Sequence, residues 1–241
     1  MAASGFADVV SYAITPKCYE EYFLNYNFFD AFCFKAILSR YLNLSIVLGS
    51  VLVKLPQIVK IVKESSVDGL SLISFFLELT SVTFTVSYNI ANQYAFSTWG
   101  ESFFISIQCA ILVAMFLYYT RRPFLSGGFL LAYVMISYVL SFGLVPIGVL
   151  TSLQITTIPI MMASKVFQIW KNFTNGSTGQ LSAITTFLNL FGTLARIFTT
   201  LQDVGDYLIL LSFVVSTFLN ALLVFQLLYY WNVKKEGDKK D

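Results

Sequence analysis

Seven long apolar stretches follow one another along the chain from about residue 40 onward, and short polar or helix-breaking segments separate them. Each stretch is close to the roughly 20 residues that an α-helix needs to cross the hydrocarbon core of a bilayer. The stretches are 40–60, 70–92, 101–120, 127–146, 148–170, 181–201 and 207–231. The pattern predicts an all-α membrane protein with seven transmembrane helices.

The first 37 residues have a different pattern, because charged residues interrupt each apolar run and aromatic residues cluster between them. A secretory signal needs a continuous apolar core, which this segment lacks, and we therefore expect no secretory signal here. An aromatic-rich segment at the membrane interface is the better interpretation. Cys18 and Cys33 lie in this segment. They predict either two free thiols or, in an oxidising lumen, a disulfide that closes a loop of about 15 residues.

An internal repeat with a constant offset runs through the chain, since 54–60 (KLPQIVK) recurs as 165–171 (KVFQIWK). The register then holds without a gap across three apolar stretches of each copy, which chance similarity between apolar segments does not explain. It predicts two parallel three-helix repeats joined by a linker helix, a 3+1+3 arrangement. The expected divisions are an N-terminal segment 1–37, a first repeat 38–120, a linker 121–147, a second repeat 148–231 and a lysine-rich tail 232–241.

Composition agrees with a membrane protein and narrows its chemistry. The chain is 57% hydrophobic and 12% charged, whereas soluble domains carry about 25% charged residues. It has no histidine and a net charge of +2, which argues against His-based catalysis, most transition-metal sites and nucleic-acid binding. The apolar stretches hold no paired nucleophile and base. We therefore expect a protein that is not an enzyme and needs no cofactor or metal.

The distribution of Lys and Arg predicts the orientation. One set of loops carries most of the basic residues, whereas the opposite loops between the stretches carry none and include Asp203 and Asp206. Basic loops favour the cytosolic side. We expect the N-terminus in the lumen and the C-terminus in the cytosol.

Polar residues inside the apolar stretches are the candidate functional residues, because ionisable groups in a span usually face an interior or a pathway. Asn43, Ser50, Lys54 and Gln57 would share one face of a continuous first helix. Equivalent positions recur in the fifth stretch, so two polar seams are expected to face each other across a cavity. The alternative is that these residues only pack helices together. The candidate substrate-binding residues are Lys54, Gln57, Glu78, Asn89, Lys165, Gln168, Asn189 and Arg196.

Some of these residues have two interpretations each. Lys54 and Glu78 are expected to pair, either as a structural contact or as a gate. Arg196 suits phosphate binding, or else its side chain extends to the luminal surface. Asn189 aligns with Glu78 in the repeat. Pro56 disturbs its helix and predicts either a hinge or a fixed kink.

Residues 52–57 (LVKLPQ) are followed by a short loop and by residues 69–72 (GLSL). This combination resembles the PQ-loop motif of the PQ-loop and SWEET group of seven-helix proteins. The second copy departs from it, since Phe167 stands where proline would complete the motif, and no hinge is expected there. Further segments are most similar to members of the group involved in mannose-P-dolichol utilisation. They are 77–79 (LEL), 97–101 (STWGE), 175–176 (NG), 178–185 (TGQLSAIT) and 194–199 (LARIFT).

The resemblance implies a multi-pass protein of the endoplasmic reticulum membrane. Such a protein is required to use dolichol-phosphate mannose and dolichol-phosphate glucose in lipid-linked oligosaccharide, N-glycan and GPI-anchor synthesis. It would flip or present the lipid-linked sugar, or support the luminal glycosyltransferases. Other members of the group imply the alternative, a transporter of a small sugar or amino acid. The expected partners are therefore membrane lipid, a dolichol-phosphate-linked sugar and luminal transferases. One chain suffices for a pore, and the sequence leaves the oligomeric state open.

Overall fold

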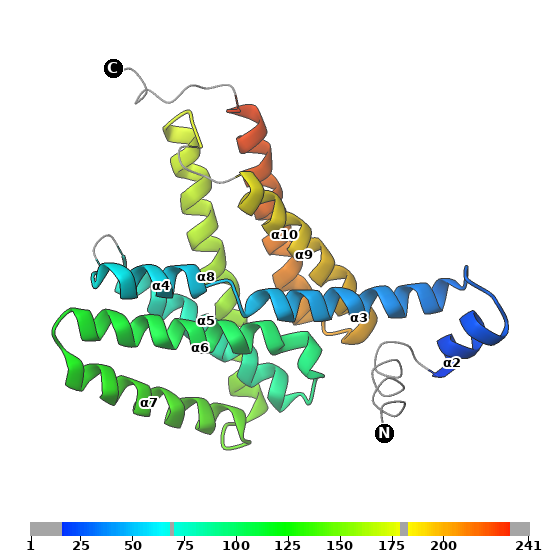
Figure 1. Cartoon of the computed structure of the whole chain (residues 1–241), viewed down its shortest axis with the longest axis horizontal. Coiled ribbons are helices and arrows are strands. Elements are labelled where there is room, and N and C mark those ends of the chain that lie inside the picture. Colours follow the sequence, from blue (N-terminus) through cyan, green and yellow to red (C-terminus); the bar gives the residue numbers. More distant parts are fainter. Residues whose placement is uncertain (1–15, 68–69, 179–182, 232–241) are drawn as a thin grey trace.

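The protein is described by a computed structural model that covers residues 16–67, 70–178 and 183–231; the side chains of Pro16 and of residues 183–185 are not described. The regular structure in these ranges is helical (Figure 1). The predicted cytosolic tail 232–241 lies outside the described residues. The helices are α2 (Pro16–Tyr19), the π-helix η1 (Glu20–Leu24), α3 (Ala31–Ser50), α4 (Leu55–Glu64), α5 (Leu72–Ala91), α6 (Phe96–Tyr119), α7 (Pro123–Ser141), α8 (Ile147–Thr174), α9 (Ala183–Asp203) and α10 (Tyr207–Tyr229).

The apolar stretches of the sequence correspond closely to these helices, and the all-helical, multi-pass membrane class is confirmed. Within the described residues, five segments are long and apolar enough to cross a membrane. They are Ala31–Glu64, Phe96–Tyr119, Pro123–Ser141, Ile147–Thr174 and Tyr207–Tyr229. The two other predicted spans form α5 and α9, which carry Glu78 and Arg196 and many Ser, Thr and Asn side chains. These polar residues lower the hydropathy of both helices.

The first long helix begins earlier than the composition of the N-terminal segment predicted. Asp30 caps α3, because its Oδ1 accepts a hydrogen bond from the backbone N–H of Cys33 at 2.8 Å. Residues 31–37 therefore belong to the helix. Cys18 and Cys33 are joined by a disulfide, so the second of the two interpretations of these cysteines is the one observed.

The expectation that the first helix continues from Asn43 through Gln57 is wrong, whether Pro56 was taken as a hinge or as a fixed kink. α3 ends at Ser50, and α4 begins at Leu55 with Pro56 in its first turn, where a missing N–H costs no helical hydrogen bond. The buried side chain of Gln108 on α6 bridges the break. Its Nε2 donates to the Ser50 carbonyl at 2.9 Å, and its Oε1 accepts from the Lys54 N–H at 2.8 Å. In the second copy, which has Phe167 instead of proline, α8 continues unbroken.

The two repeats pack in the same way. α5 packs on α6 as α9 packs on α10, and α3 packs on α6 as α8 packs on α10. Between the repeats, α3 contacts α9 and α5 contacts α8, so the first helix of each repeat meets the second helix of the other. α7 lies against α6 and α5, and none of its residues, all of which are described, is buried. Its exposed apolar side chains suit contact with lipid.

Polar contacts between described residues of the two repeats gather toward one end of the molecule. We call the end with the loops 92–95, 142–146 and 204–206 the joined end, and the end with α4 and the C-termini of α6, α8 and α10 the open end. An apolar cluster of Tyr88, Leu150 and Ile209 ties α5, α8 and α10 together at the joined end. At the open end, α4 and α6 extend to the left of Figure 1, whereas α8 and α10 extend to its top. The helices therefore do not share one common axis.

Candidate functional site

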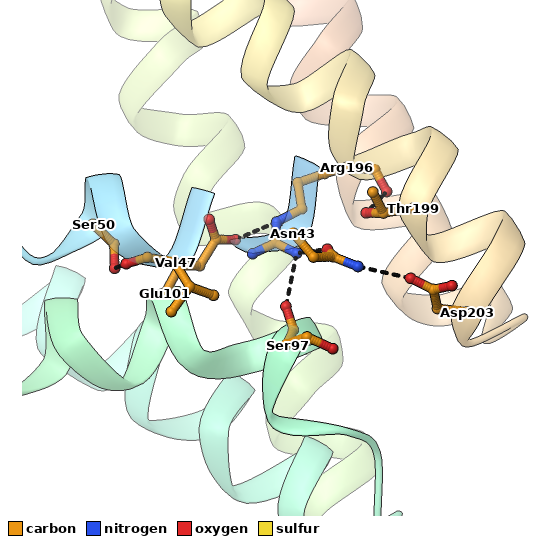
Figure 2. Close-up of polar contacts among 8 residues, drawn as sticks. All are labelled: Asn43, Val47, Ser50, Ser97, Glu101, Arg196, Thr199 and Asp203. Carbon is orange, nitrogen blue, oxygen red and sulfur yellow. Dashed lines mark hydrogen bonds and ion pairs between the residues drawn. The ribbon is translucent and has the colours of Figure 1, made fainter. Parts of the chain in front are cut away.

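A buried arginine lies at the centre of the joined end (Figure 2). The side chain of Arg196 on α9 is 4% exposed, and its Nε lies 2.8 Å from Oε1 of Glu101 on α6. Its Nη1 donates to Oδ1 of Asn43 on α3 at 2.8 Å and to the Ser97 carbonyl at 3.4 Å. Arg196 therefore links α9 to both α3 and α6. Its side chain is buried among these helices, and Glu101 already neutralises the charge that was expected to bind phosphate.

Asp203, the last residue of α9, adds a second carboxylate to this network. Its Oδ2 accepts hydrogen bonds from Nδ2 of Asn43 and from Oγ of Ser39, each at 2.7 Å. Asn43 thus uses its oxygen for Arg196 and its nitrogen for Asp203 (Figure 2). Ser39 and Asn43 are 0% and 2% exposed. Because buried polar groups must be hydrogen-bonded to be tolerated, this network specifies how the two repeats meet.

Asp206 forms another contact between the repeats. Its Oδ1 caps α10 by accepting from the N–H groups of Leu208 and Ile209, and its Oδ2 accepts from the hydroxyls of Tyr88 and Tyr94, each at 2.7 Å. Burial alone would raise the pKa of Asp206, but these hydrogen bonds together outweigh burial and lower it. Burial, and then the hydrogen bond to Asp206, raise the pKa of Tyr94 to about 12.

A cavity of about 600 Å³ adjoins this network. Arg40, Asn43, Ser97, Gln202 and Asp203 contribute its polar wall, and apolar residues of α3 and the start of α6 complete it. Both repeats therefore line the cavity. The hydrogen bonds and ion pairs named above between the two repeats lie at the joined end.

The first repeat contains a lysine centre toward the open end. The Lys54 ammonium lies 2.7 Å from Oε1 and 2.8 Å from Oε2 of Glu78, so the predicted pair forms. The side chains of Lys54 and Glu78 are 18% and 38% exposed. The centre joins the start of α4 to α5 inside one repeat, and its charges balance.

The second repeat contains the corresponding lysine centre with different partners. The ammonium of Lys165, which is half-buried on α8, donates to Oδ1 of Asn220 on α10. Nδ2 of Asn220 donates in turn to the Asn189 carbonyl at 3.2 Å and to Oγ1 of Thr193 at 3.3 Å. No carboxylate of the described residues lies within 4.0 Å of this ammonium.

The remaining candidates do not gather into one site. Gln57 and Gln168 are half-buried on α4 and α8, and neither is hydrogen-bonded to a lysine within the described residues. Asn89 is 1% exposed, and its Nδ2 donates to the Thr85 carbonyl at 2.7 Å. Its Oδ1 has no hydrogen-bond partner among the described residues. The predicted seam of the first repeat is interrupted, because Asn43 and Ser50 lie on α3 whereas Lys54 and Gln57 lie at the start of the separate helix α4.

Sequence reasoning missed several of the residues that matter most. Gln108 and Asn220 are amides in the middle of strongly apolar stretches, and that rarity was a usable signal. Glu101 was noted only as part of a matching segment, and Asp203 and Asp206 only as acidic loop residues. Nothing in the local sequence pairs them with Arg196, Asn43 or Tyr88.

Comparison with known proteins detects the same internal repeat. A model described as "PQ loop repeat" matches residues 38–98 and 149–209, and the two matches are offset from each other by the same spacing as Lys54 and Lys165. The human protein Solute carrier family 66 member 3 is 28% identical over 177 residues, which cover 73% of this chain and 86% of that protein.

Proposed function

Since the chain belongs to the PQ-loop repeat family of membrane proteins, we propose that it moves or presents a polar substrate across the endoplasmic reticulum membrane. The proposed substrate is a lipid-linked sugar phosphate, dolichol-phosphate mannose or dolichol-phosphate glucose, for use in lipid-linked oligosaccharide, N-glycan and GPI-anchor synthesis. The protein acts by moving or presenting this substrate and catalyses no reaction itself. Luminal glycosyltransferases would be its functional partners.

The observation that carries this proposal is the unequal contact between the repeats. They are held together by buried polar contacts at the joined end, and each repeat holds a lysine centre toward the open end. A molecule built from two halves that part at one end suits a substrate that enters between them. We assign it a 3+1+3 arrangement, with α3/α4, α5 and α6 in one repeat, α7 as the linker, and α8, α9 and α10 in the other.

The orientation belongs to the same proposal. The Cys18–Cys33 disulfide joins α2 to the first turn of α3. Disulfides persist in oxidising compartments. Placing this end in the lumen agrees with the bias of Lys and Arg toward the opposite loops. The joined end is then luminal, the open end is cytosolic, and the substrate enters from the cytosolic side.

Physical chemistry favours a protein path for this substrate. A sugar and a phosphate cannot cross hydrocarbon without losing their hydrogen bonds to water. Polar side chains between the repeats would replace that water while the polyprenyl chain stays in lipid. The exposed apolar side chains of α7 and α10 suit the lipid side of such a path.

The second candidate is a transporter of a soluble sugar or amino acid. It is favoured by the similarity to Solute carrier family 66 member 3. The two candidates differ in whether the substrate carries a lipid tail.

The purified full-length protein in liposomes tests both. We expect it to speed the transbilayer movement of a short-chain dolichol-phosphate mannose analogue compared with protein-free liposomes. Uptake of a free hexose or amino acid without movement of the analogue would establish the second candidate instead. In cells that lack the protein, truncated lipid-linked oligosaccharides support the first candidate, and a stored soluble metabolite supports the second.

A further inference from the structure

The two lysine centres occupy equivalent positions of the repeat but differ in charge. Lys54 of the first repeat aligns with Lys165 of the second, and the same offset relates Glu78 to Asn189. The first repeat therefore has a carboxylate where the second has a carboxamide. The Lys54 centre is neutral because Glu78 contacts the ammonium with both oxygens. No carboxylate of the described residues balances the charge of the Lys165 ammonium.

Asn220 holds the Lys165 ammonium in place without neutralising it. Its Nδ2 is fixed by the Asn189 carbonyl and by Thr193, so its Oδ1 is aimed at the ammonium. Asn220 is 2% exposed, and Cys109 occupies the equivalent position in the first repeat. The second repeat thus has an amide that orients the lysine, and it has no acid at the position that balances the lysine of the first repeat.

The position of this charge favours binding of a counter-ion. Lys165 lies six residues before Lys171, about 9 Å deeper along α8. An ammonium that is half-buried within a membrane span is costly unless an opposite charge approaches it. It has three N–H donors, of which Asn220 takes one. The exposed side chain of Asn189 lies on α9, the helix that also anchors Asn220.

We propose that the Lys165 ammonium, oriented by Asn220, is the binding group for the phosphate of the substrate. This assignment rests on the proposed function and makes it specific. A phosphodiester carries one negative charge, which would bring the Lys165 centre to the same neutral balance that Glu78 gives to Lys54. Lysine is well suited to bind phosphate as a point charge. Arg196 and Lys54 are not the phosphate ligands, because Glu101 and Glu78 already neutralise them.

Binding to the purified full-length protein in nanodiscs tests the assignment. The probes are a short-chain polyprenyl-phosphate mannose and the matching polyprenyl mannoside, which lacks the phosphate. We expect the wild-type protein to bind the phosphodiester at least tenfold more tightly than the neutral mannoside. Lys165→Gln should abolish this preference and leave binding of the mannoside within about twofold.

Two variants make the test sharper. Asn189→Glu gives the second repeat the acid of the first, so it should pair with Lys165 and remove the phosphate preference while keeping the lysine. Lys171→Gln removes an exposed lysine from the same helix and should keep the preference within about twofold. Thermal unfolding of each variant confirms that it is folded.

The outcomes separate the two proposals. If the wild-type protein prefers the phosphodiester and both Lys165→Gln and Asn189→Glu retain that preference, the assignment to Lys165 is overturned while the proposed function stands. If the wild-type protein shows no preference for the phosphodiester, the proposed substrate is overturned together with this site.

Discussion

The ion pair between Arg196 and Glu101 gives a quantitative test of how the repeats are joined. Arg196→Met leaves the Glu101 carboxylate, whose side chain is 21% exposed, without its cation. It also leaves Asn43 Oδ1 without its donor. Removing one partner of a buried pair costs about 3–5 kcal/mol of unfolding free energy. Glu101→Gln should cost a comparable amount, because it leaves the nearly buried guanidinium uncompensated.

The double variant should be far less destabilised than the sum of the single variants. Once both charges are gone, neither leaves a buried counter-charge behind. Contacting residues show coupling energies of roughly 0.5–3 kcal/mol, and for this pair we expect at least about 2 kcal/mol. The assay is a double-mutant cycle on the purified full-length protein in a mild detergent, with unfolding by denaturing detergent followed by tryptophan fluorescence.

Lys60 and Glu64 provide a matched control. Their charged atoms lie 3.9 Å apart on α4, and their side chains are 71% and 57% exposed. The same cycle should give a coupling of only about 0.3–0.5 kcal/mol for this i,i+4 pair. If the effects of the Arg196 and Glu101 variants simply add within about 0.5 kcal/mol, the pair does not join α9 to α6 and the description of the joined end is refuted.

Three further predictions concern Gln108, Asp206 and the Lys54–Glu78 pair. Gln108→Leu should lower the unfolding free energy by about 1–3 kcal/mol, since it leaves two backbone groups at the α3–α4 break without their partner; an unchanged denaturation midpoint would show that the break needs no bridge. The lowered pKa of Asp206 stabilises the folded protein above the unfolded pKa of about 3.9, and this stability is lost as pH falls through the folded pKa. Unfolding measured from pH 7 to pH 3 should therefore show less acid destabilisation in Asp206→Asn than in the wild type, and equal curves would contradict this role. Exchanging the Lys54–Glu78 pair (Lys54→Glu with Glu78→Lys) should restore most of the stability that either single change removes, and activity that stays absent in a stable double variant would give the pair a direct role in transport.

The membrane class, the helix order and the repeat were accessible from the sequence because they depend on local or periodic properties. Apolar length decides which segments span a bilayer, and an ungapped, constant offset between the two copies reveals the duplication without any knowledge of contacts. The Lys54–Glu78 pair was predictable for a related reason. Both charges lie within spans that follow one another in the chain, and an isolated charge in a membrane needs a partner.

Only the tertiary structure decided how the copies differ and where they touch. Pro56 marked a disturbed helix, but the structure shows a full break after Ser50 that is bridged by Gln108, a side chain 54 residues from Lys54 that replaces the missing backbone partners. Arg196 looked like a phosphate ligand until Glu101, from the other repeat, was found beside it. The sequence showed that Asn189 stands at the position equivalent to Glu78. The structure showed that Lys165 contacts Asn220 and that no carboxylate of the described residues pairs with Lys165. Long-range pairing of this kind depends on which helix faces pack together, and no local pattern of residues encodes it.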